Sequence, residues 1–323
     1  MKKNSFNWFL GAALALPLCG TSFAGDLASS KEPVIDSVPE LDPWADLRRP
    51  ITNPTHFDLA IPDNVIHPIF INQRMPSTID TILGNVPVGG DFQLYALQVE
   101  LQLTERLSLN ATKDGYIVFN PDSTLEDTEG FANLGAGLKY AWLLQPENGL
   151  ASNFQLLFEA PTGNDEVWQG NGDGSLIPSI NVTKLADRWQ FVDQFGFKLP
   201  IDSSESSFFY NSVHVSYELT EWLFPLVEVN YFKVLDAGDG GARFFPQAGG
   251  AVPAIATFEG GDLVNWGAAN AGNNDDLVTL GLGFRIRLPN KNTDIGVAWE
   301  IPLTEEDQSI MKDRITLDLV HRF

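Results

Sequence analysis

The chain has 323 residues, with 42 acidic and 20 basic side chains and a formal charge of −22 at pH 7. So acidic a surface repels polyanions, which excludes nucleic acid as a partner. After the first two dozen residues, no apolar run reaches the length of about eighteen residues that a transmembrane helix needs.

Residues 1–24 have the pattern of a secretory signal peptide. Two lysines precede an apolar stretch over 6–18. Small residues at the two positions that a signal peptidase recognises predict cleavage after Ala24. The apolar stretch is too short for a membrane anchor, which needs about twenty residues. The single cysteine, Cys19, lies inside this peptide, so the mature chain is expected to have neither disulfides nor thiol chemistry. With 18 basic and 42 acidic residues left, the mature charge becomes −24.

Residues 25–64 are expected to form a periplasmic N-terminal segment. The part from 25 to 55 is rich in Ser, Pro and Asp and lacks the alternation seen later in the chain. Within it, 43–49 is a candidate for a short helix that enters the mouth of the following domain.

From residue 65 onward the dominant pattern is alternation of apolar and polar residues. In 95–103 every odd position is apolar, and in 278–288 every even one is. Successive side chains of a strand point to opposite faces, and a tilted membrane strand needs about nine to eleven residues. We therefore predict an all-β fold, an antiparallel transmembrane β-barrel of about twelve strands over 65–323. The predicted strands are 65–74, 91–104, 107–119, 130–144, 150–162, 175–185, 189–200, 207–219, 222–234, 277–289, 293–303 and 312–323.

The connections between these strands alternate between short and long. Tight turns such as 104–106 and 220–221 alternate with long Gly/Asp/Asn segments, and the longest outer loop is expected at 235–276. Short periplasmic turns and long outer loops are typical of barrels in the outer membrane of Gram-negative bacteria. Outer-membrane lipids and lipopolysaccharide are therefore expected neighbours. Aromatic residues near strand ends predict interfacial belts, formed by Tyr140, Trp142, Trp189, Trp222, Tyr231 and Phe232.

Several short motifs resemble a known family. Residues 158–163 and 172–175 resemble the Pro-Thr-Gly and Gly-x-Gly-Ser signatures of the family labelled "MetA-pathway of phenol degradation". Its Leu-Thr-Asp-Arg-Leu turns resemble 103–107, and its later strands resemble 276–283. The resemblance runs from about residue 54 to the end. It implies an outer-membrane channel or transporter for a small solute, with an aromatic or hydrophobic solute as one candidate, and it carries over no site residues.

The polar face of the strands is expected to line the lumen. Beside Gln98, Gln102, Gln155, Asn230, Arg314 and Asp318, the candidate pore-lining residues are Glu100, Lys139, Glu159, Lys198, His214, Glu218, Glu228, Arg285, Arg287 and Glu300. Charges inside a barrel must be hydrated or paired, because burying an isolated charge is costly. Two interpretations follow: a constriction with a transverse field, or a salt-bridged filling that conducts nothing.

An enzymatic role has little support in the sequence. A Ser-His pair of an outer-membrane lipid hydrolase would need His214 and Ser216, yet parity assigns both to the lumen. The other histidines show no metal-ligand spacing, and acidic residues in the outer loops are better explained as solvated loop tips than as a calcium site. We therefore predict no enzyme activity, no metal and no cofactor.

The last strand carries an expected barrel-assembly signal. Apolar residues alternate along it and an aromatic residue ends it, which resembles the signal that the barrel-assembly machinery reads. The residues concerned are Ile315, Leu317, Leu319 and Phe323. Two functions stay open at this stage: a channel for a small solute, or a non-conducting barrel that displays its loops.

Overall fold

The computed structural model describes residues 44–81, 84–236, 238, 276–306 and 311–323. The chain divides into two units, 1–41 and 42–323, and the first lies outside the described residues together with the predicted signal peptide. Most of the predicted long loop 235–276 lies outside them as well. Among the described residues, no helix is long and apolar enough to cross a membrane.

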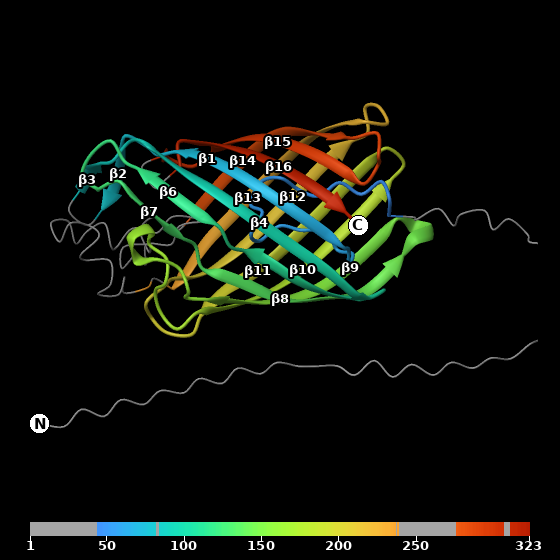
Figure 1. The fold of residues 1–323 in the computed structure, drawn as a ribbon, viewed down its shortest axis with the longest axis horizontal. Helices are drawn as coiled ribbons and strands as arrows, with labels where there is room; N and C mark the ends of the chain where they lie inside the picture. Colours follow the sequence, from blue (N-terminus) through green and yellow to red (C-terminus); the bar gives the residue numbers. More distant parts are fainter. Residues whose placement is uncertain (1–43, 82–83, 237, 239–275, 307–310) are drawn as a thin grey trace, which may run out of the picture. The chain divides into compact units, whose positions relative to one another are not determined.

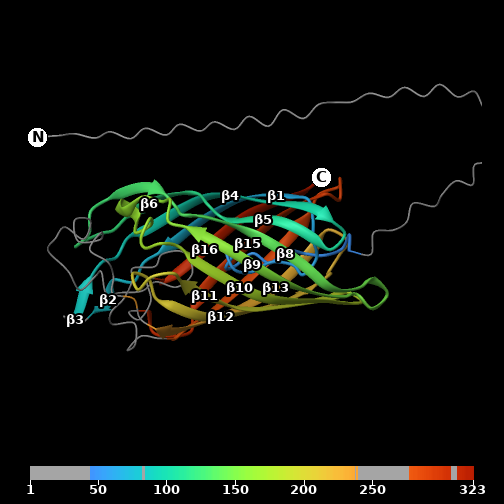
Figure 2. The same cartoon turned by 90° about the horizontal axis from the view of Figure 1, so that it is seen from below.

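The described strands form one closed antiparallel barrel (Figure 1 and Figure 2). Twelve strands make the ring, because β1 pairs with β16 on one side and with β4 on the other. The predicted strand count is confirmed. The ring contains β1 (Val65–Arg74), β4 (Asp91–Thr104), β5 (Leu107–Lys113), β8 (Leu134–Gln145), β9 (Leu150–Ala160), β10 (Ser175–Ala186), β11 (Trp189–Pro200), β12 (Ser207–Tyr217), β13 (Leu223–Asp236), β14 (Asp276–Arg287), β15 (Thr293–Pro302) and β16 (Asp313–Arg322).

Two predicted strands are interrupted. The strand expected at 107–119 is β5 followed by β6 (Tyr116–Asn120), and the one expected at 130–144 is β7 (Thr128–Phe131) followed by β8. At the first break, the carboxylate of Asp114 accepts a hydrogen bond from the backbone N–H of Leu97 at 2.9 Å. The Asp114 carboxylate thus replaces a backbone carbonyl of the neighbouring strand as the acceptor. On one side of the break β4 pairs with β5, and on the other side it pairs with β6.

The two ends of the barrel differ. Tight turns and Phe323 lie at one end, here called the inner end, while the long connections lie at the outer end. The outer connections include an unpredicted hairpin of β2 (Thr78–Thr81) and β3 (Gly84–Pro87), and a short 3-10 helix, η2 (Asp165–Val167); a second, η1 (Pro146–Asn148), lies in an inner turn. A C-terminus on the side of the short turns is typical of bacterial outer-membrane barrels.

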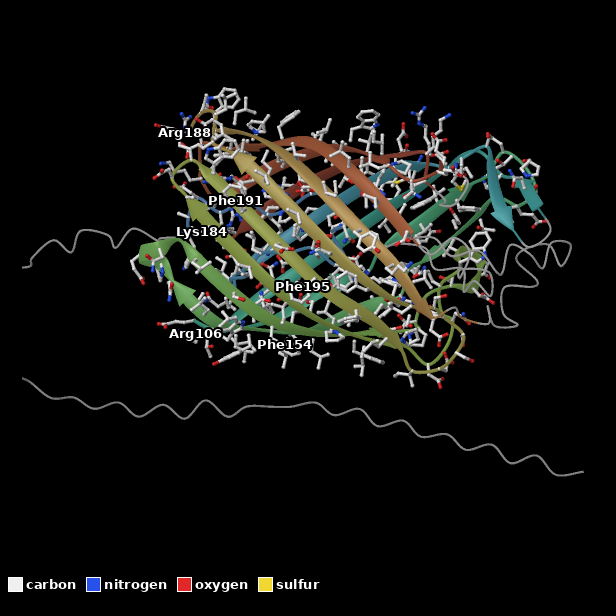
Figure 3. The ribbon with its side chains drawn as sticks, turned by 180° about the vertical axis from the view of Figure 1, so that it is seen from behind. Arg106, Phe154, Lys184, Arg188, Phe191 and Phe195 are labelled. Atoms are coloured by element: carbon white, nitrogen blue, oxygen red, sulfur yellow. The ribbon has the colours of Figure 1, made fainter. Side chains whose placement is uncertain are left out.

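The outer surface of the barrel is apolar. Large side chains such as Phe154, Phe191 and Phe195 point away from the wall and are 38–46% exposed (Figure 3). Arg106, Lys184 and Arg188 lie at the ends of strands in the same view. An apolar band flanked by charged ends matches a lipid bilayer. Of the predicted belt residues, Trp142, Trp189 and Trp222 are exposed, but Phe232 is 6% exposed and faces the lumen, which corrects its assignment.

Candidate functional site

The lumen is occupied by the chain's own N-terminal residues 44–63, here called the lumen segment (blue in Figure 1). It enters through a turn in which Leu47 N–H donates to the carbonyl of Trp44, and it reverses direction at Asn53, whose carbonyl accepts from His56 and Phe57 N–H. The predicted helix over 43–49 is wrong in its described part, which is a turn followed by chain without regular secondary structure. The segment also reaches well beyond the barrel mouth, because buried polar groups of the wall need partners and its backbone supplies them.

Glu228 of β13 holds the segment near its turn. Its carboxylate accepts from Ile51 N–H at 3.0 Å, from Thr52 N–H at 2.6 Å and from the Thr52 hydroxyl at 2.6 Å. His214 of β12 approaches the same carboxylate with Nδ1 at 2.6 Å. Glu228 and His214 are fully buried. Opposite them Gly281 leaves room, since a Cβ there would lie 2.6 Å from the Thr52 methyl carbon.

Arg285 of β14 holds the same stretch from the other side. Its guanidinium donates to the backbone carbonyls of Arg49 and Pro50, the latter at 3.0 Å, and forms two bonds to Asp318 at 2.9 and 2.6 Å. Asp318 in turn contacts Nε2 of His67 at 2.8 Å. The fork of an arginine matches a carboxylate in this bidentate manner, which fixes its direction. Arg285 therefore positions segment backbone rather than free solute.

Four buried charges join the segment to β4 and β8. Arg49 contacts Asp58 at 2.5 Å and Glu100 at 2.8 Å, while Lys139 contacts Asp58 at 2.7 Å and Glu100 at 2.9 Å. Burial raises the pKa of Asp58, but the charges of Arg49 and Lys139 outweigh it and hold that pKa below its ordinary value. Two cations facing two anions is a balanced arrangement, so each charge has a partner when the segment is docked.

A second ion cluster lies toward the outer end. Glu159 contacts Lys113 at 2.5 Å and Lys198 at 3.4 Å, and Lys198 also contacts Glu205 at 2.8 Å. These residues come from β5, β9, β11 and the connection before β12. Their contacts run across the wall instead of to the lumen segment.

At the inner end a cavity of about 640 Å³ opens beside the point where the segment enters. Arg287, Glu218 and Asp46 line it. Arg287 binds Asp294 at 2.9 Å and Asp46 at 3.1 Å, and its guanidinium lies 5.1 Å from the centre of the Phe224 ring. This end is therefore charged and open to water.

The outer half of the lumen has a different character, because two apolar clusters lie there beside the Glu159 ion cluster. One cluster includes Phe92 and Phe119 with Trp168 folded in from the loop after β9, and the other is built around Tyr210. Facing the lumen in the two clusters are Ile69, Ile71, Phe92, Leu94, Ile117, Phe119, Leu157, Ile177, Phe208, Tyr210 and Phe232. The outer half thus combines two apolar clusters with an ion cluster, and the inner half holds charged contacts of the lumen segment.

The predicted lumen residues lie mostly inside. Nine of the ten pore-lining candidates are at most 7% exposed in the barrel interior: Glu100, Lys139, Glu159, Lys198, His214, Glu228, Arg285, Arg287 and Glu300. Glu218 is half-buried just beyond β12, at the inner cavity. Gln102, assigned inward by parity, is exposed, because the pattern of β4 ends before its inner turn.

Sequence reasoning missed several partners of these residues. Arg49 and Asp58 belong to a segment with no periodicity, and His67 lies on β1, where both faces carry apolar residues. Glu205 lies in a connection, outside any alternating strand. Asp294 is not among the predicted candidates, although the alternation of β15 places it on the same face as Glu300. The two residues of the Ser-His pair that the sequence disfavours have other partners: His214 is bound to Glu228, and the Ser216 hydroxyl accepts from Arg48 Nε at 3.1 Å.

Solved structures with similar folds are outer-membrane barrels. An outer membrane channel from Pseudomonas putida F1 matches with a TM-score of 0.54 and 13% identity, over 81% of this chain and 96% of that one. The β domain of the Bordetella autotransporter BrkA matches with a TM-score of 0.45 and 8% identity, over 81% of this chain and 100% of that one. The KdgM porin in complex with oligogalacturonate matches with a TM-score of 0.44 and 8% identity, over 80% of this chain and 99% of that one. The first likeness shows the fold, so the chain is an outer-membrane β-barrel.

A comparison of the sequence with family models identifies its relatives. No curated protein sequence matches the chain. The model described as "Putative MetA-pathway of phenol degradation" matches residues 72–255, more than half of the chain. The match is shorter at both ends than the resemblance over 54–323 predicts. The chain belongs to this family, described as the MetA-pathway of phenol degradation.

Proposed function

We propose that the protein is an outer-membrane channel for a small apolar or aromatic solute, and that the lumen segment closes it. The observation that carries this proposal is the pair of apolar clusters in the outer half of the lumen, beyond the charged contacts that hold the segment. Apolar wall residues there admit a solute that water holds weakly, and the charged contacts hydrate once the segment leaves. The family to which the chain belongs is consistent with such a solute.

The attachment of the segment supports its role as a gate. Beside the apolar packing of Ile51 on Leu226 and Ala298, its contacts near Thr52 are hydrogen bonds and ion pairs, and water can replace such polar contacts at a modest net cost. Displacement leaves Lys139 facing Glu100 and Arg285 facing Asp318, so the wall keeps its charges paired. We propose the ten predicted lumen residues as pore-lining in that open state, with Glu218 at its inner exit.

A second candidate function is a non-conducting barrel, and the occupied lumen is the observation that favours it. If the segment never leaves, the barrel is a closed scaffold whose outer loops meet lipopolysaccharide or a partner. We further propose that the protein is not an enzyme, since His214 is bound to Glu228 of the wall and Ser216 to Arg48 of the lumen segment.

Conductance measurements separate the two functions. Purified protein is inserted into planar bilayers alongside the variant Glu228→Gln, which weakens the hold on the segment. A channel shows stepwise openings that become more frequent in the variant. Silence of both proteins across salts and voltages contradicts the channel and supports the closed scaffold.

A further inference from the structure

Tyr210 of β12 forms a flat aromatic surface on the lumen wall. Its neighbour in the ladder is Gly196 of β11. A Cβ at Gly196 would lie 2.6 Å from the Tyr210 hydroxyl oxygen, so the absence of a side chain there lets the phenol ring cross over β11. Tyr210 is fully buried, and Leu157 and Ile177 pack in the same cluster. One face of the ring is thus turned toward the lumen segment.

The face of Tyr210 is covered by a ring from the lumen segment. The imidazole of His56 stacks on it with centroids 4.8 Å apart and planes inclined by 29°. Phe208 meets His56 edge-on at 5.9 Å and 75°, and Phe232 meets Phe208 edge-on at 6.0 Å and 71°. These are the offset and edge-to-face geometries that aromatic rings prefer. His56 therefore sits as a planar ring in an aromatic niche formed by Phe208, Tyr210 and Phe232.

The position of His56 links this niche to the gate. It lies four residues after Thr52, at the turn of the segment, where its N–H donates to the carbonyl of Asn53 at 3.1 Å. Asn53 also donates from its side-chain amide to the hydroxyl of Ser212 on β12 at 2.9 Å. The turn, the niche and the Glu228 contacts thus lie along one short stretch of chain. A ring that displaces His56 competes with the docking of that stretch.

We propose that the niche of Phe208, Tyr210 and Phe232 is a binding site for a small planar aromatic solute, and that His56 occupies it in the closed state. This inference rests on the proposed channel function and deepens it, because the solute would compete with the gate for one site. A neutral monocyclic phenol suits the site in size, since one ring replaces another. A saturated ring of equal size lacks the flat face and the quadrupole that stacking uses.

The test measures binding of 4-fluorophenol by ¹⁹F NMR to the purified full chain, with phenol and cyclohexanol as competitors. Phenol should displace the probe and cyclohexanol should not, although both carry one hydroxyl on a six-membered ring. His56→Ala should tighten binding about tenfold by removing the competing ring. Tyr210→Leu should abolish the specific signal, whereas Tyr210→Phe should retain it and serves as the matched control.

The outcomes distinguish this inference from the channel itself. Two results would overturn the proposed binding site. One is displacement of the probe by cyclohexanol as well as by phenol, and the other is unchanged probe binding in His56→Ala with an intact barrel. Barrel integrity is followed by the shift of the folded band on unheated gels. If conductance occurs without specific binding, the channel stands and the inference fails. If binding is specific but no variant conducts, the inference about the niche stands and the channel proposal fails.

Discussion

Glu228 and Thr52 form a double contact between the barrel wall and the lumen segment, with the carboxylate accepting from both the backbone N–H and the hydroxyl at 2.6 Å. A carboxylate acceptor makes each bond charge-assisted, and such bonds contribute about twice as much as neutral ones. Loss of this contact is therefore the most direct way to release the segment.

The first prediction concerns Glu228→Gln. The amide keeps one acceptor oxygen but loses the charge, which weakens docking by about 1–2 kcal/mol. The open fraction in planar bilayers should rise about 5- to 30-fold. Glu105→Gln, in an exposed inner turn, is the control and should match the parent. An unchanged open fraction in Glu228→Gln would contradict the proposal that Glu228 holds the lumen segment in the closed state.

The second prediction uses the close approach of Gly281 to the segment. In Gly281→Ala the new methyl group meets the Thr52 side-chain carbon, because the two would be 2.6 Å apart. We expect more frequent openings. Thr52→Ser removes that carbon and keeps the hydroxyl, so the double variant should return toward the parent. If the double variant does not return toward the parent, the effect of Gly281→Ala comes from the wall, and Gly281 does not make room for Thr52.

Most of the fold could be predicted from the sequence, because alternation marks strands wherever only one face meets lipid. The bounds 91–104 and 189–200 agree with β4 and β11 at both ends. The bounds 65–74 also agree with β1, but apolar residues on both of its faces left its lumen-facing residues, His67 among them, unassigned. Period-two patterns assign such strands to no particular face.

The docked segment could not be predicted, for a physical reason of its own. Its partners Glu228 and Arg285 lie 176 or more residues away in the sequence, and its backbone provides many of the contacts. Backbone groups carry no sequence signal. What the sequence did contain was the wall's half of each contact, the inward charges of residues such as Glu228 and Arg285.

The third prediction is a dependence of gating on pH. Asp58 has a pKa below its ordinary value of about 3.9, so its contribution to docking is complete above that value. It is lost as pH falls through the lower value in the docked state, because protonation removes the partner of Arg49 and Lys139. The open fraction should stay constant from pH 7 to about 4 and rise below it. Asp58→Asn should open more at pH 7 and lose that rise, while the exposed Asp187→Asn should not.

The fourth prediction concerns ion selectivity at the inner exit. Arg287 is the buried cation of a cavity that Glu218, Glu221 and Asp46 also line. Arg287→Gln leaves an excess of negative charge there, so the reversal potential under a KCl gradient should shift toward cation preference. Lys291→Gln, at the exposed rim, should shift it less because salt screens its charge. Equal reversal potentials in all three proteins would place the constriction elsewhere.

The fifth prediction returns to the last strand. Ile315 and Leu317 point to lipid, Leu319 is half-buried, and Phe323 is 61% exposed while its N–H donates to the carbonyl of Asn64 at 3.1 Å. Because its side chain makes lipid contact without packing in the core, its removal should leave the stability of the finished barrel nearly unchanged. We nevertheless expect deletion of Phe323 to lower the amount of folded barrel in outer-membrane fractions several-fold, since the assembly machinery would lose its aromatic signal. Phe323→Tyr is the matched control and should assemble normally. Equal amounts of barrel with and without an aromatic end would show that assembly does not read this residue.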